Sequence, residues 1–370
     1  MNTKLKFYFS WLLIGISSVG VCQHSRKSAD GKLTGAELKP LGRYALNDKK
    51  ELELISSAAH FGFKFTEKSC TVMASVPASY SHGYLQYELD GVYQKRVKID
   101  NKATVPIVIE GASAENHKVW VYKATEAHTG PIYIASIKGH NLKAIPVSKA
   151  PLIEFIGNSI TCGAAADDSE IPCGQGDYQD HHNAYMAYGP RVARLLGANY
   201  VLSSVSGIGV YRTWNLDGPS MPQVYEKTDF QNKGTRLWDF KTFTPKVVSI
   251  ALGTNDLSTG DGKNPRKPFD STMFINSYVK FIQQIKAKYP NARIALLSSP
   301  MVKGHDRTLL QDCLISIKRR VEAQYPLAHP VATFFFEPME PHGCAGHPSV
   351  EDHEILAQQL KPFFRKLLTK

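Results

Sequence analysis

The stretch LIEFIGNSITCG, residues 152–163, joins a run of apolar residues to a turn with Ser159 at its crest. Continuous apolar strands that alternate with helices indicate a parallel sheet covered on both faces. The sequence therefore predicts a three-layer α/β/α domain with a five-stranded parallel sheet over residues 150–370. Four further runs of this kind follow: NYVLSSVSG (199–207), KVVSIALGTND (246–256), ARIALLSSP (292–300) and ATFFFEP (332–338).

A helix is expected between two of these strands. Residues 272–290 repeat apolar side chains at helical spacing, so that one side of the helix should face the core. The side chains on that side are Phe274, Tyr278, Phe281, Ile282 and Ile285.

The part of the chain that precedes residue 150 has a different pattern. Residues 40–147 contain short segments that alternate apolar and polar residues, are rich in Val, Ile and Tyr, and are separated by Gly, Asp and Asn turns. Several short strands with such turns predict a β-sandwich, here of jelly-roll type. For a chain of 370 residues, two folded units are also the expected number.

The first residues are typical of an export signal. Lys4 and Lys6 precede an apolar stretch that is too short to span a bilayer comfortably, and small residues follow it. We expect residues 1–22 to be a signal peptide and the mature protein to be secreted or periplasmic. Lipid attachment at Cys22 is the alternative, but Val21 stands where such sites usually have a small residue. No other segment resembles a membrane span.

The net charge of the chain and the distribution of its basic residues indicate which kinds of partner it binds. The formal net charge of +11 favours acidic surroundings such as the cell envelope or charged glycans. Because the basic residues are dispersed rather than grouped with aromatic residues, a nucleic-acid partner is not indicated. Asp180, His181 and His182 are interpreted as a polar loop, since adjacent histidines point apart and no acidic residue with ligand spacing follows. No metal or other cofactor is expected.

Export would permit disulfides. Cys162 and Cys173 flank a short loop and could either form a bridge or remain two thiols. Cys70, Cys313 and Cys344 have no partner that the sequence identifies, and none of the spacings is typical of a zinc site.

Polar turns follow three of the predicted strands, and a fourth polar group opens the last helix. Because sites in such sheets lie beyond the carboxyl ends of the strands, these groups should meet. Ser159 is then a candidate nucleophile for acyl transfer, with His347 as its base. The backbone N–H groups of Ser159 and Gly207 and the amide of Asn255 could form an oxyanion hole. The four groups are residues 157–159, 206–209, 253–256 and 342–353.

Several of these assignments have alternatives. Ser159 alone could be a helix cap. Gly209 offers the same close backbone approach as Gly207. His342 lies near His347, whereas His353 falls inside a helical pattern and is expected at the surface. Tyr211 and Trp214 follow the second turn and could stack on a sugar ring or only pack.

The motifs also carry a family resemblance. GNSIT, SGIG and GTND resemble the first three blocks of the Ser-Gly-Asn-His (GDSL-type) hydrolases, and GNSITCG, GTND and GHPSVEDH behind a sandwich look like carbohydrate esterase family 2. The resemblance implies an exported enzyme without a cofactor that removes acetyl groups from polysaccharides such as xylan or glucomannan, often at the 6-hydroxyl. It gives Ser159, Gly207, Asn255 and His347 the roles named above.

One position departs from that family pattern. Many relatives have an aspartate two or three residues before the histidine, where this chain has Ala345 and Cys344. A backbone carbonyl, or else one of Glu337, Glu340 and Asp352, would have to fix the imidazole tautomer. Two other functions stay open: a sugar O-acetyltransferase that uses the same acyl-enzyme, and an inactive glycan-binding homologue.

Overall fold

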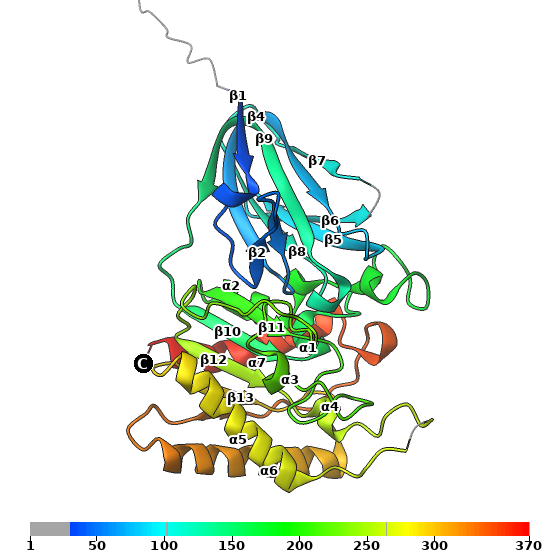
Figure 1. Ribbon diagram of the computed structural model, residues 1–370, viewed down its shortest axis with the longest axis vertical. Helices are drawn as coiled ribbons and strands as arrows, with labels where there is room; N and C mark the ends of the chain where they lie inside the picture. The colour runs from blue at the N-terminus through cyan, green and yellow to red at the C-terminus, as the bar shows by residue number, and fades with distance from the viewer. Residues whose placement is uncertain (1–29, 101–102, 264, 370) are drawn as a thin grey trace, which may run out of the picture.

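The computed structural model describes residues 30–100, 103–263 and 265–369. Figure 1 shows a body of β-strands above a second body in which helices cover a sheet. The predicted signal peptide and Cys22 lie outside the described residues. Within the described part of the chain, no helix has the length and apolarity needed to cross a membrane.

The upper body is a nine-stranded antiparallel sheet with the path β2-β3-β9-β4-β8-β5-β6, to which β1 and β7 are added at β9 and β4. Its strands are β1 (Asp30–Thr34), β2 (Tyr44–Leu46), β3 (Leu52–Leu54), β4 (His60–Ser75), β5 (His82–Leu89), β6 (Val92–Asp100), β7 (Val105–Glu110), β8 (His117–Lys123) and β9 (Ile132–Ile145).

The long strand β4 connects the two parts of this sheet. Its first half pairs with β8 and its second half with β7, while β9 runs beside both halves through register shifts. Alternate side chains of β4, including Phe61, Phe63 and Phe65, are buried in one apolar core. This arrangement confirms the predicted strand-rich sandwich.

The lower body is a five-stranded parallel sheet in the order β11-β10-β12-β13-β14. Its strands are β10 (Leu152–Gly157), β11 (Asn199–Ser204), β12 (Val247–Ala251), β13 (Arg293–Leu297) and β14 (Ala332–Phe334). They coincide with the five apolar runs and confirm the predicted parallel sheet.

Helices cover both faces of this sheet (Figure 1). Helices α2 (Tyr188–Leu195) and α7 (Val350–Thr369) pack on one face, where Phe155 contacts Tyr188 and Phe364. Helices α5 (Ser271–Lys288) and α6 (Gly304–Gln324) pack on the other. The predicted face of α5 is fully buried, which confirms the helical pattern.

Short helices complete the fold. They are α1 (Ser159–Cys162), α3 (Met221–Val224), α4 (Thr254–Leu257), η1 (Gly35–Glu37), η2 (Ala127–Thr129), η3 (Tyr178–His181), η4 (Ala184–Met186) and η5 (Cys344–Gly346). The register aligns Gly157 at the end of β10 with Ser204 of β11 and Ala251 of β12. The turns that follow these three strands therefore meet at one edge, as expected for parallel strands.

The cysteine pairing differs from the bridge considered above. Cys173 is bonded to Cys344, 171 residues away, whereas Cys162 is a buried thiol. Cys162 ends α1 beneath the strand ends, where its Sγ lies 3.2 Å from Ser204 Oγ. A bridge between Cys162 and Cys173 is therefore wrong, because α1 directs Cys162 into the core while Cys173 lies on an exposed loop.

The surface position expected for His353 is also wrong. The His353 side chain is completely buried and stacks on Tyr188, whose backbone N–H donates to His353 Nδ1 at 3.3 Å. His353 shares one face of α7 with the buried residues Leu356 and Leu360. The sequence contained this signal, because positions three and seven residues apart lie on one side of a helix.

Buried histidines should make the protein less stable in acid. Burial lowers the pKa of His353 to about 3 and that of His60 to about 4, whereas the ordinary value is 6.5. Below pH 6.5 the unfolded chain binds protons that these folded residues do not bind, so the free energy of unfolding should fall with pH. At pH 5 the expected loss is up to about 2 kcal/mol per histidine.

Urea unfolding at pH 7.5, 6 and 5 would measure this effect. His60→Gln and His353→Gln cannot titrate and should each flatten the dependence on pH. If the free energy of unfolding depends on pH in both variants as it does in the wild type, the lowered pKa values of His60 and His353 would be contradicted.

Candidate active site

Ser159 lies where β10 passes into α1. Asn158 caps this helix, since its Oδ1 accepts the N–H of Ile160 at 3.1 Å. A Cβ on Gly157 would lie 2.0 Å from Thr161 Oγ1, so only glycine permits such a tight passage from strand to helix. Capping is therefore performed by Asn158, and the Ser159 hydroxyl is available for another contact.

That contact is with His347. Its Nε2 lies 2.9 Å from Ser159 Oγ, and its Nδ1 lies 3.0 Å from the carbonyl oxygen of Ala345. A carbonyl can only accept, so Nδ1 carries the proton and Nε2 is left to accept from the hydroxyl. Burial lowers the pKa of His347 below its ordinary value, which keeps the imidazole neutral, and so able to accept a proton, near pH 7.

The Ala345 carbonyl contacts His347 Nδ1, as the acidic residue does in a Ser-His-Asp triad. Ala345 and Gly346 both have left-handed backbone conformations, with φ of 50° and 70°. This turn directs the carbonyl of Ala345 back to the imidazole two residues later. Non-glycine residues rarely adopt such a conformation, and those that do are concentrated at functional sites.

The carboxylates considered as alternatives bind elsewhere. Asp352 accepts from His342 Nδ1 at 2.9 Å and from the Ser349 N–H at 2.9 Å. Glu337 pairs with Arg307, and Glu340 pairs with Lys303. These contacts leave the Ala345 carbonyl as the partner of His347 Nδ1, and they pair His342 with Asp352 rather than with Ser159.

The candidate hydrogen-bond donors come from the next two strand ends. Gly207 has a φ of 74°, and a Cβ there would lie 2.7 Å from Trp214. Asn255, on α4, donates from Nδ2 to the carbonyl of Ile208 at 2.8 Å, which joins the two donor turns. Gly209 packs instead against the buried Asp256 and does not line the cavity.

A cavity of about 580 Å³ opens above Ser159 and His347. Gly207, Asn255 and Trp214 also line it, and Trp214 is 44% exposed. Two further turn residues, Ser206 and Ser258, together with Ile160, Tyr178, Thr254, Met301, Ala345 and Gly346, complete the lining. The sequence-predicted dyad, both donors and Trp214 therefore face one space.

Two aromatic residues differ from the sequence analysis. Tyr211 lies outside the cavity, where its ring packs near Phe269 and its hydroxyl accepts the N–H of Asp270 at 3.2 Å. Tyr178 was not singled out, yet its ring contacts His347 edge-on with centroids 6.1 Å apart. No sequence motif indicates the position of Tyr178, because it reaches the cavity from a long loop and not from a turn at a strand end.

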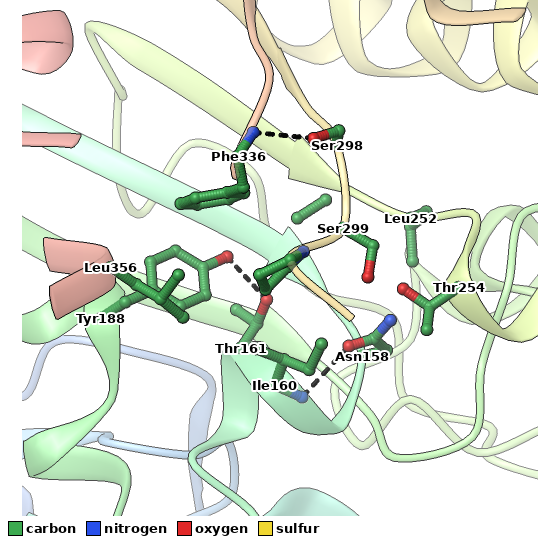
Figure 2. A pocket seen from close by; sticks show the side chains of 12 residues that line it. Asn158, Ile160, Thr161, Tyr188, Leu252, Thr254, Ser298, Ser299, Phe336 and Leu356 are labelled. Atoms are coloured by element: carbon green, nitrogen blue, oxygen red, sulfur yellow. Dashed lines mark hydrogen bonds between the residues drawn. The ribbon is translucent and has the colours of Figure 1, made fainter. Parts of the chain in front are cut away.

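A much smaller pocket of about 10 Å³ lies behind the nucleophile turn, and Figure 2 shows its side chains. Thr161 Oγ1 and the Tyr188 hydroxyl are hydrogen-bonded at 2.8 Å, and Ser298 Oγ accepts the N–H of Phe336 at 2.9 Å. The first contact ties α1, which begins at Ser159, to α2, and the second joins the segments that follow β13 and β14.

The polar loop near residue 180 is held mainly by hydrogen bonds to residues of the sandwich. Asp180 accepts from His82 Nε2 at 2.6 Å and from the Tyr84 hydroxyl at 2.7 Å, and His182 Nε2 lies 3.4 Å from Glu126. His181 Nε2 lies 3.2 Å from the carbonyl of Pro172. The two adjacent histidines point to different partners, as expected for a polar loop.

Comparison with known proteins identifies both bodies. Residues 41–146 match the Carbohydrate esterase 2 N-terminal family, and residues 155–331 match the GDSL-like Lipase/Acylhydrolase family.

Two curated relatives illustrate the match. The chain is 27% identical over 335 residues to the cellulase/esterase CelE of Acetivibrio thermocellus, covering 86% of this chain but only 38% of that longer protein. An acetylxylan esterase / glucomannan deacetylase of Cellvibrio japonicus is 28% identical over 280 residues, which are 72% of this chain and 76% of the relative.

Solved structures share the fold. A family two carbohydrate esterase from Clostridium thermocellum, in complex with cellohexaose, superposes with a TM-score of 0.78 at 24% identity, covering 92% of this chain and 99% of that one. A carbohydrate esterase family 2 enzyme from Corynascus thermopiles gives 0.74 at 26% identity, covering 90% and 100%. The chain therefore carries a Carbohydrate esterase 2 N-terminal domain followed by a GDSL-like Lipase/Acylhydrolase domain.

Proposed function

We propose that this chain is an exported esterase that removes acetyl groups from a polysaccharide through an acetyl-Ser159 intermediate. The observation that carries the proposal is the 2.9 Å contact between His347 Nε2 and Ser159 Oγ, two residues that line the cavity. We place the sandwich at residues 40–147 and the hydrolase domain at residues 150–370, after a signal peptide at residues 1–22.

The first half of the reaction forms the acyl-enzyme. Ser159 Oγ attacks the acetyl carbonyl carbon while His347 Nε2 takes the hydroxyl proton. The carbonyl oxygen becomes negative and accepts hydrogen bonds from the N–H groups of Ser159 and Gly207 and from Asn255. One N–H of the Asn255 amide already donates to Ile208, which leaves the second for substrate. The tetrahedral intermediate then collapses, and His347 returns the proton to the departing sugar oxygen.

The second half releases acetate. A water molecule attacks the acetyl carbon of the ester on Ser159, and His347 Nε2 accepts a proton from that water. Collapse of this second intermediate breaks the bond to Ser159 Oγ, which recovers the proton from His347. Throughout, the Ala345 carbonyl keeps the imidazole in the same tautomer and stabilises the imidazolium through Nδ1–H.

The substrate class follows from the relatives and the cavity. The two Cellvibrio japonicus relatives are named acetylxylan esterase / glucomannan deacetylase, which supports an acetylated xylan or glucomannan as substrate, with the 6-hydroxyl as one position. The exposed indole of Trp214 at the cavity offers a surface on which a sugar ring can stack. Export is supported by the apolar N-terminal segment and by the Cys173–Cys344 disulfide.

Acetate release from acetylated xylan, glucomannan and pectin would test the proposal. We expect release from xylan or glucomannan by the wild type and none by Ser159→Ala. Equal, slow release by both proteins would contradict the esterase function and favour the inactive glycan-binding alternative. Transfer of acetyl from a donor to an unacetylated glycan, in preference to water, would favour the O-acetyltransferase.

A further inference from the structure

Glu126 is a buried acidic residue that the reaction described above does not use. It follows β8 in the sandwich and precedes η2, and its side chain is only 3% exposed. Its backbone carbonyl accepts hydrogen bonds from Lys123 Nζ at 2.6 Å and from Thr129 Oγ1 at 2.8 Å. The carboxylate itself points away from the sandwich and toward the hydrolase sheet.

The first contact of this carboxylate is with the donor turn. Glu126 Oε2 accepts the backbone N–H of Ser206 at 2.7 Å. Ser206 directly precedes Gly207, whose N–H we assign to the oxyanion hole, and the Gly207 carbonyl accepts the N–H of Trp214 at 2.8 Å. Hydrogen bonds thus hold the donor turn on both sides of the Gly207 N–H.

The second contact leads toward the base. Glu126 Oε1 lies 3.4 Å from His182 Nε2, and the N–H of Ala165 points to His182 Nδ1 at 3.4 Å. Because a backbone N–H can only donate, Nδ1 is the acceptor and Nε2 carries the proton that is donated to Glu126. The carbonyl of Ala165 in turn accepts the N–H of Cys344, three residues before His347.

We propose that Glu126 is a positioning residue, through which the sandwich holds the donor turn at Gly207 and the loop of His347 in their catalytic arrangement. This inference rests on the esterase function proposed above. It assigns the sandwich a part in the reaction that is separate from any binding of glycan.

The charge of Glu126 supports this role. Burial alone would raise its pKa, but the contacts with His182 and the Ser206 N–H outweigh burial and lower the pKa to about 2. Glu126 is therefore an anion wherever a neutral His347 can act. The groups that face His347 are Ser159, the Ala345 carbonyl, Tyr178 of η3, and more distantly His182 and Glu126. Among them, Glu126 is the negative charge that stabilises the imidazolium.

Glu126→Gln is the decisive variant. Its one carbonyl oxygen can accept from Ser206, but its NH₂ then faces His182 Nε2. A change of the His182 tautomer would only direct Nδ1–H at the N–H of Ala165. We expect kcat to fall about 10- to 100-fold with KM changed less than about threefold, because the reacting groups shift while the cavity stays. The acidic limb of the kcat/KM profile should move to lower pH, because His347 loses a stabilising anion.

Glu154→Gln is the matched control. Glu154 is an equally buried glutamate at 2% exposure, but it lies within β10 and accepts from Ser203 Oγ at 2.6 Å and from the Tyr225 hydroxyl at 3.0 Å. This variant should lower the melting temperature without moving the acidic limb or lowering kcat. If Glu126→Gln does not fold, His182→Gln can be used instead. It removes the imidazole that contacts Glu126 Oε1 and should show a smaller loss of kcat.

The aryl acetate assay distinguishes the possible failures when wild type, Ser159→Ala and the three glutamine variants are measured together. Wild-type activity no greater than that of Ser159→Ala would overturn the esterase and the positioning role together. An active wild type with kcat and pH profile unchanged in Glu126→Gln, or in His182→Gln if the former does not fold, would overturn only the positioning role. The positioning role would also be overturned if the loss of kcat in each variant, Glu154→Gln included, were simply proportional to the fall in its melting temperature.

Discussion

Replacing His347 by alanine is expected to lower kcat by about 10⁴- to 10⁶-fold, as much as replacing Ser159, because nucleophile and base act as one unit. Among the residues that the structure describes, His347 Nε2 is the acceptor that lies within hydrogen-bond distance of Ser159 Oγ, and the variant removes it. The double variant should lose no more than either single variant. Steady-state and burst kinetics with an aryl acetate, in wild type, both single variants and the double variant, would measure this.

Asp352→Asn provides the matched control for the dyad. Asp352 accepts hydrogen bonds from His342 and from the N–H of Ser349, just before α7, rather than from His347, so kcat should fall less than about tenfold. The main effect should be on stability, because the variant weakens a helix cap. A loss as severe as that of His347→Ala would transfer the orienting role from the Ala345 carbonyl to Asp352.

The second large effect is expected at Asn255. Asn255→Ala removes the only side-chain donor assigned to the oxyanion hole and should lower kcat about 10²- to 10³-fold. KM should change little, because this hydrogen bond strengthens as negative charge develops on the carbonyl oxygen. Initial rates over a range of acetyl-ester concentrations would separate the two constants.

Ser258→Ala is a suitable comparison for Asn255→Ala. Ser258 lines the same cavity, but its hydroxyl accepts the N–H of Gly260 at 3.1 Å within its own loop. We expect kcat to stay within about threefold of the wild type, as is usual for substitutions away from a special contact. Similar losses in both variants would indicate a general disturbance of the cavity and would remove Asn255 from the oxyanion hole.

Much of the fold is readable from the sequence because its signals are local. The five apolar runs specify buried parallel strands, and the period of residues 272–290 specifies the buried face of α5. Once the strands are known, the rule on carboxyl ends brings Ser159, Gly207 and Asn255 to one edge. The meeting of these turns is therefore predictable without coordinates.

The features that were wrong or missed depend on distant parts of the chain. Cys173 and Cys344 are 171 residues apart, so no short spacing announces their bond. The carbonyl of Ala345 reaches His347 only because of a left-handed turn, which an alanine does not signal. Glu126 comes from the other body of the molecule, and nothing in the sequence marks it. His353 is different, because its spacing on α7 already indicated burial.

The separation of Ser159 and His347 along the chain has a consequence for biosynthesis. The two residues are 188 positions apart, and four of the five parallel strands, β11 to β14, lie between them. A ribosome therefore completes the strand that presents Ser159 long before it adds the loop that carries His347. In the proposed mechanism, Ser159 has its base only once that loop has docked against Ala165 through the N–H of Cys344. In that mechanism, a chain that lacks the last segment has no base for Ser159 and should be inert.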